Sequence, residues 1–152
     1  MSKAIIVAAT PCCGKSTLAT NCTKYKVLDV EVAMNKFNNH KYKSSLDCIL
    51  SNMGTYDIIL IVPSTPLLYN LSKRGIDYSL VYTDNTKECM NEWERRHAER
   101  GTSDLWKCTK PVFRSINNSL KHDKDAKFHY VLKPTEFLSD IIDKIYEDNS
   151  KQ

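Results

Sequence analysis

Four consecutive residues near the start of the chain, Gly14-Lys15-Ser16-Thr17, have the side chains expected of a phosphate-binding site. They follow a short apolar run, Ile5 to Ala9. Gly14 has no Cβ, so the backbone there can approach an anion closely. Lys15 is long enough to reach the β- and γ-phosphates of a nucleotide, and the Ser16 hydroxyl is a ligand for Mg²⁺.

A strand, a loop, Gly-Lys-Ser and a helix in this order are typical of the phosphate-binding P-loop. The full pattern has glycine at position 9, where this chain has Ala9. Alanine fits there if the backbone needs no positive φ. The amides that open the following helix are expected to face the anion. The predicted nucleotide-binding residues are Pro11, Cys12, Cys13, Gly14, Lys15, Ser16 and Thr17, and Ser16 is the predicted metal ligand.

The composition is that of a globular protein with a substantial core. The chain has 152 residues, of which 41% are hydrophobic, and no apolar run reaches the roughly 20 residues that span a bilayer. The net charge of +4 is too small to indicate a nucleic-acid surface. No signal-peptide cleavage site is evident, so we expect one cytoplasmic domain over residues 1–152, without a membrane partner.

Six cysteines are present, and their spacing does not favour disulfides or a metal site. Cys12 and Cys13 are adjacent inside the predicted loop, which is a poor position for a structural bridge. The other four, Cys22, Cys48, Cys89 and Cys108, lie in apolar helical patterns and are expected to be small core residues. Reduced cysteines agree with a cytoplasmic location.

Short apolar runs alternate with helical patterns along the chain. Strands are expected over 5–9, 26–30, 56–62, 76–82 and 128–132. Helices are expected over 16–25, 46–53, 66–74 and 87–100, from about 111, and over 137–146. Ser44 and Thr65 are the expected N-caps of two of them, and the polar segment 35–45 is expected to be irregular. The alternation predicts a three-layer α/β fold, a five-stranded parallel sheet with helices on both faces.

A group of arginines, Arg95, Arg96 and Arg100, precedes Gly101 after the fourth expected strand. Phosphoryl transfer requires positive charge around the transferring group, because negative charge spreads over its oxygens. Arg96 and Arg100 are favoured for this role over Arg95. The alternative is that basic residues at the end of a helix only complement its dipole.

With its P-loop, its element order and the R-x-x-x-R spacing of Arg96 and Arg100, the chain resembles the small P-loop kinases. This superfamily contains the nucleoside and nucleoside monophosphate kinases, and the likeness extends to phage-type deoxynucleoside monophosphate kinases. The resemblance implies a P-loop NTPase fold with an arginine-bearing lid over about 95–110, and ATP and Mg²⁺ as cofactors.

Asp29, at the end of the second expected strand, is the fourth candidate catalytic residue beside Lys15, Arg96 and Arg100. Kinases that phosphorylate a hydroxyl use such an acid to accept the hydroxyl proton, whereas a monophosphate acceptor needs no base. In the second case the carboxylate would organise the acceptor or a metal-bound water. The structural alternative is that Asp29 caps the next turn. Glu31 lies close by, and the choice between the two acids stays open.

The main hypothesis is a kinase that adds the γ-phosphate of ATP to a (deoxy)nucleoside monophosphate. One alternative is a kinase for a hydroxyl on a nucleoside or on DNA. The other is an ATP-binding regulatory protein without turnover, which Ala9 and the lack of an acid after the third strand would favour. Trp93 and Trp106 are expected to be packing residues, with base stacking by Trp106 as the alternative.

Overall fold

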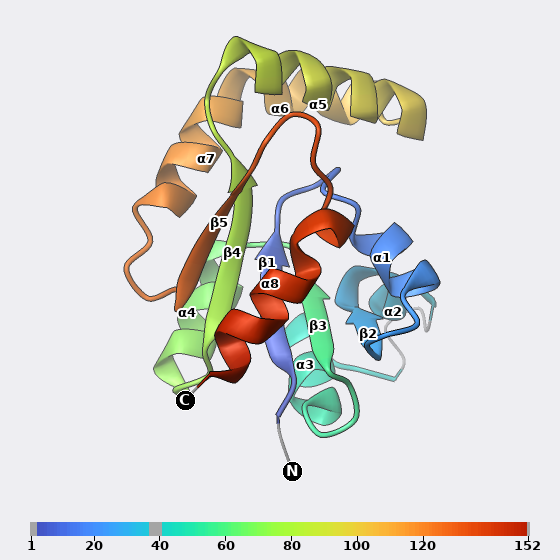
Figure 1. The fold of residues 1–152 in the computed structure, drawn as a ribbon, viewed down its shortest axis with the longest axis vertical. Coiled ribbons are helices and arrows are strands. Elements are labelled where there is room, and N and C mark those ends of the chain that lie inside the picture. Colours follow the sequence, from blue (N-terminus) through green and yellow to red (C-terminus); the bar gives the residue numbers. More distant parts are fainter. Residues whose placement is uncertain (1–2, 37–40, 152) are drawn as a thin grey trace.

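Five parallel strands form one sheet in the order β2-β3-β1-β4-β5 (Figure 1). The structure is a computed structural model that describes residues 3–36 and 41–151. The strands are β1 (Ile5–Ala9), β2 (Val27–Asp29), β3 (Ile58–Ile61), β4 (Tyr78–Thr83) and β5 (Phe128–Leu132). All five predicted strands are present. Every residue of β3 and β4 is buried, because helices cover both faces of the sheet.

The helices lie between successive strands, or in the case of the last helix after the final strand, and they cover the two faces of the sheet. They are α1 (Lys15–Asn21), α2 (Val30–Lys36), α3 (Ser45–Asn52), α4 (Thr65–Lys73), α5 (Lys87–Arg100), α6 (Ser103–Thr109), the 3₁₀ turn η1 (Lys110–Val112), α7 (Phe113–Lys121) and α8 (Leu138–Ser150). The predicted α/β architecture is therefore confirmed at the level of the sheet and its helical layers.

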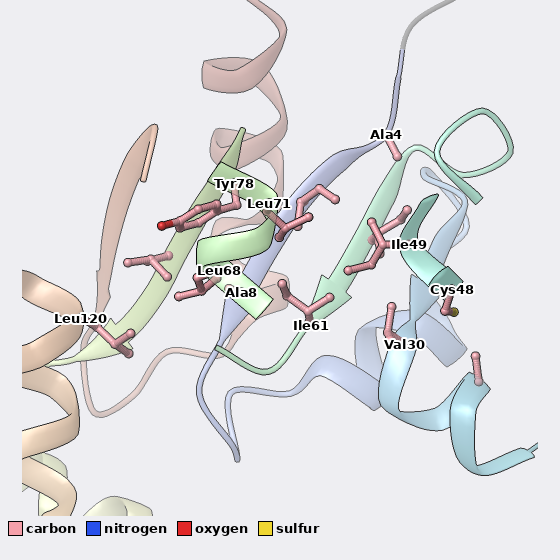
Figure 2. Packing of buried hydrophobic residues seen from close by; sticks show 14 of the residues in the cluster. Ala4, Ala8, Val30, Cys48, Ile49, Ile61, Leu68, Leu71, Tyr78 and Leu120 are labelled. Atoms are coloured by element: carbon pink, nitrogen blue, oxygen red, sulfur yellow. The ribbon is translucent and has the colours of Figure 1, made fainter. Parts of the chain in front are cut away.

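Two apolar clusters hold these layers together. On one face, α2, α3 and α4 cover the sheet, and Figure 2 shows Leu68 and Leu71 of α4 packed beside Tyr78 and Ile61 of the strands. On the other face, α1 and α8 pack with the aromatic residues of α5 and α6. In the described ranges, no helix is long and apolar enough to cross a membrane.

Several predicted boundaries are wrong, and each has a local cause. Helix α2 starts directly after β2, where continued strand and irregular chain were expected, because Val30 and Ala33 bury one face of a helix. Residues 37–40 of the segment expected to be irregular lie outside the described residues. Helix α4 begins one residue earlier than predicted, since the Ser64 hydroxyl, not Thr65, accepts the cap hydrogen bond from the Leu67 amide.

The cysteine predictions hold in part. All six cysteines are free thiols. Cys48 and Cys89 are core residues as predicted, and Cys22 is half-buried. Cys108 is exposed, which contradicts the prediction, because Trp106 occupies the buried side of α6.

Candidate functional site

A cleft of about 350 Å³ lies at the carboxyl ends of β1 and β2, where parallel sheets bind their ligands. We call it the P-loop cleft, after the phosphate-binding loop that the sequence predicts there. It brings together the loop after β1, the start of α2, the end of α5, and residues of α6 and of the turn before α8. The predicted site residues that line it are Pro11, Cys12, Gly14, Lys15, Ser16, Thr17, Asp29, Arg96 and Arg100. The exception is Cys13, a residue of the same loop that is fully buried and does not line the cleft.

The carbonyl oxygens of the loop are all engaged by the protein itself. Each one from Ala9 to Gly14 accepts a hydrogen bond. The donors are Lys15 Nζ to Ala9 and Thr10, Trp93 Nε1 to Pro11, Arg96 Nη1 to Cys12, Leu138 N to Cys13 and Leu18 N to Gly14. The loop is thus held in place through its carbonyl groups. The donors come from α5, above the loop in Figure 1, and from the start of α8 beside it.

From Cys12 onward, the backbone N–H groups of this loop and of the start of α1 have no hydrogen-bond acceptor among the described residues, whereas the Thr10 amide donates to Val81 O. Within the part of the chain that the structure describes, no acceptor contacts the amides from Cys12 to Thr17. The first amides of a helix have no partner within it, and successive free amides around left-handed residues form an anion-binding concavity. The left-handed residues here are Cys12, with φ of 67°, and Gly14, with φ of 95°. The loop therefore offers several donors to a negatively charged group.

The glycine pattern of the loop has a specific structural explanation. Ala9 lies in β1 and is not among the residues with positive φ, so glycine is not needed there. Cys12 does adopt a left-handed conformation, which costs about 1–2 kcal/mol for a residue with a side chain. Gly14 has a φ of 95°, which favours glycine, and a Cβ atom there would also make a tight contact of 3.3 Å with Cδ1 of Phe137.

Lys15 places a buried ammonium at the base of the loop. Its Nζ donates to the carbonyls of Ala9 (2.9 Å) and Thr10 (3.2 Å), which leaves one of its three N–H donors for a ligand. Burial lowers the pKa of Lys15, and the carboxylates of Asp29 and Glu31 are among the groups that oppose this shift. Two acids therefore lie near the lysine, and the cleft contains charges of both signs.

Arg96 has a structural position that differs from the predicted lid role. The residue is 4% exposed, and its guanidinium lies between the rings of Trp93 and Phe137, with Cζ 4.1 and 3.8 Å from their centroids. Four of its five N–H donors are engaged. Nε donates to Glu92 Oε2, one Nη1 donor to Cys12 O, and the two Nη2 donors to Pro134 O and Glu136 O. Arg96 thus joins the loop to α5 and to the segment before α8.

Arg100, one turn further along α5, keeps its donors available. It is exposed, and its one hydrogen bond among the described residues runs from Nη1 to Cys12 Sγ at 3.3 Å. Trp93, Arg96 and Arg100 recur at spacings of three and four residues, so α5 directs one stripe of side chains at the loop. Of the two predicted lid arginines, Arg100 is the one that faces the cleft with free N–H groups.

The region predicted as a lid, residues 95–110, consists of the end of α5 and helix α6. Trp106 is 3% exposed and stacks on His97, with the ring centroids 5.4 Å apart. Its ring also meets Phe113 edge-on. Trp93 and Trp106 are therefore packing residues as predicted, and base stacking by Trp106 is excluded by its burial.

Asp29 caps the helix that follows it. Its Oδ1 accepts the amides of Glu31 (3.1 Å) and Val32 (3.3 Å) at the start of α2, and the residue is 6% exposed. The structural alternative for Asp29 is thus present in the molecule. Glu31 is exposed, and its carboxylate makes no hydrogen bond or ion pair with another described residue.

The stability of the fold is expected to depend on pH through Glu92, which pairs with Arg95 and Arg96. Hydrogen bonds from Arg95 and from Arg96 lower the pKa of Glu92 from 4.5 to about 2. Because the pKa is lower in the folded state, Glu92 stabilises the fold above pH 4.5, and this contribution is lost as the pH falls toward 2. We expect Tm to fall less across this window in Glu92→Gln than in the wild type. Thermal denaturation at a series of pH values from 4.5 down to about 2, the interval between the two pKa values of Glu92, measures this difference, and equal slopes of Tm against pH in the two proteins would contradict it.

Some lining residues were missed by sequence reasoning. Phe137, 39% exposed, packs over Gly14 and forms part of the cleft wall, together with Val32, Glu99 and Leu105. Phe137 was expected to be the first residue of the amphipathic helix over 137–146, whereas it is the residue that precedes α8. The chain matches no model of a protein family and no curated protein. Functional assignment therefore depends on the residues and geometry of the cleft.

Proposed function

We propose that this protein binds a nucleoside triphosphate, ATP in the first instance, in the P-loop cleft and transfers its terminal phosphoryl group to a small acceptor. The observation that carries the proposal is the run of free amides from Cys12 to Thr17 around the Lys15 ammonium. A chain of phosphates would satisfy these donors and the remaining N–H of Lys15 together. An uncharged ligand would leave most of them without partners.

Arg100 is the proposed group that neutralises charge on the transferring phosphoryl. Its guanidinium lines the same cleft as Lys15 and Ser16 and has free donors. Electrostatic stabilisation of this kind is effective because the donors are already in place when charge develops. Arg96 has a positioning role, since its contacts fix the loop.

The donors available in the cleft fit Mg²⁺. This ion prefers oxygen ligands, keeps several waters, and is usually held by one or two protein groups and the phosphates. Ser16 supplies an exposed hydroxyl in the cleft. When bound, the ion would neutralise phosphate charge. Among the described residues no group of three acids, histidines or cysteines forms a metal site by itself, so Ser16 and the nucleotide would hold the ion jointly.

The resemblance to small P-loop kinases implies a (deoxy)nucleoside monophosphate as acceptor. The alternatives are a hydroxyl on a nucleoside or on DNA, and a protein that binds ATP without turnover. The last alternative shares the ATP site and differs only in the absence of transfer. Binding and transfer must therefore be measured separately.

Replacement of Arg100 separates the two steps. We expect Arg100→Ala to lower the rate of ADP formation by about 10²–10³-fold, while the Kd for ATP measured by titration calorimetry changes much less. The reason is that the arginine is needed where charge develops in the transition state. Arg114→Ala, which removes an exposed arginine of α7, is the matched control. Equal loss of ATP binding and transfer would contradict this role for Arg100.

A further inference from the structure

A second cavity, of about 390 Å³, adjoins the P-loop cleft. It lies at the carboxyl end of β3, between α2 and the start of α4, and we call it the β3 cavity. Glu31 lines both cavities. An acceptor in the β3 cavity would therefore meet a triphosphate in the P-loop cleft beside this one carboxylate.

The lining of the β3 cavity is mostly apolar. Val30, Met34, Ile61, Val62 and Leu67 form its apolar surface, and Asn35, Ser45 and Ser64 add uncharged polar groups. The one charged side chain among its described lining residues is Glu31, and none of them is a lysine or arginine. The volume lies within the range of small-molecule sites, about 300–1,000 Å³.

This lining is unfavourable for a phosphate monoester. Such a group carries nearly two negative charges, and removing it from water requires cations or several N–H donors. Here it would instead lie close to apolar side chains and to a carboxylate of like charge, which repels it. A neutral ring that carries hydroxyl groups has no such penalty, because the apolar surface covers the ring and the carboxylate accepts a hydroxyl hydrogen.

Asp29 and Glu31, the two acids in this region, have different structural roles. Asp29 uses Oδ1 to cap α2 and is almost fully buried. Glu31 is exposed and is the one described residue that lines both cavities. A base must lie within hydrogen-bond reach of the proton that it removes, and of the two side chains only Glu31 lines the acceptor side.

We propose that the β3 cavity binds an uncharged, hydroxyl-bearing acceptor of nucleoside size, and that Glu31 accepts the proton of the hydroxyl that is phosphorylated. This inference rests on the proposed phosphotransferase function. The acceptor oxygen bonds to the γ-phosphorus as the bond between this phosphorus and the β,γ-bridging oxygen breaks. ADP leaves with the bond electrons, and the hydroxyl proton passes to Glu31 and then to water.

The test compares matched acceptors. Each common nucleoside and deoxynucleoside is offered beside its own 5′-monophosphate with ATP and Mg²⁺, and acceptor-dependent ADP formation is measured. We expect at least one nucleoside to be phosphorylated with kcat/KM at least about 10-fold above that of its monophosphate. In Glu31→Gln, kcat is expected to fall by about 10²-fold with little change in the KM for ATP, because a general base contributes about 10²–10⁴-fold. Glu88→Gln, an exposed acid of α5, is the control.

Each of the other possible outcomes would overturn a stated part of this inference. Preferred transfer to monophosphates, or transfer to DNA alone, would overturn the inference and leave the phosphotransferase function standing. A larger loss of kcat in Asp29→Asn than in Glu31→Gln would overturn the role of Glu31. ATP binding without transfer to any acceptor would overturn the inference and the phosphotransferase function together, and would favour a regulatory protein. Absence of ATP binding would also contradict the proposed nucleotide site.

Discussion

Replacement of Lys15 by methionine is expected to lower phosphoryl transfer by about 10³-fold. Methionine keeps much of the length of the side chain and removes the positive charge and all three N–H donors. The free amides from Cys12 to Thr17 would still attract phosphates, so ATP binding should weaken less than transfer. Initial rates of ADP formation and the Kd for ATP, measured on the same preparation, check this.

The Lys15 variant must be distinguished from a misfolded one. The Nζ hydrogen bonds to the Ala9 and Thr10 carbonyls are lost, but so is the cost of burying an ammonium, and burial already lowers the pKa of Lys15. We therefore expect Tm to change by only a few degrees. Lys73→Met, at the exposed end of α4, is the matched control and should retain transfer. A Lys15→Met protein with full transfer activity would contradict the mechanism.

Adjacent arginines on α5 are expected to differ sharply in their contribution to stability. Arg96→Leu should lower the free energy of unfolding by about 3–5 kcal/mol, because it leaves three backbone carbonyls without this donor and removes one of the two arginines that pair with Glu92. Arg95→Leu removes an exposed arginine whose ion pairs with Glu92 and Glu99 face solvent, and should cost less than about 1 kcal/mol.

Urea denaturation of both variants measures this difference. Arg96→Lys should recover little stability, because an ammonium cannot reproduce the planar fork that joins three carbonyls and one carboxylate. A second effect follows from the same contacts. Arg96 holds the Cys12 carbonyl, so its loss should weaken ATP binding even in the folded fraction. Equal destabilisation by Arg95→Leu and Arg96→Leu would contradict the positioning role of Arg96.

The sequence predicted the sheet well because its signals are local. Continuous apolar runs mark β1 and β3, and the bounds of β1 and β5 match the predicted ones. Helix α2 was not predicted, because a short helix with a polar face gives only a weak helical pattern of apolar residues. Its start depends on the Asp29 cap, which sequence reasoning treated as one of several roles.

The site was predictable to the level of residue types, while individual roles required the fold. Arg96 and Arg100 share the same spacing motif, yet one is buried between two rings and the other is exposed in the cleft. The partners of Arg96 come from residues 12, 134 and 136, which only the tertiary structure brings together. Likewise, the shared position of Glu31 between two cavities depends on how α2 leaves the sheet.

The most direct test of the proposed function is acceptor-dependent release of ADP from ATP and Mg²⁺ by the wild-type chain. The acceptors are nucleosides, nucleoside monophosphates and duplex DNA, each measured against a reaction without acceptor. The account predicts that at least one acceptor raises ADP release well above that background and gains one phosphate, detected by mass. ATP binding with no phosphorylated product from any acceptor would contradict it.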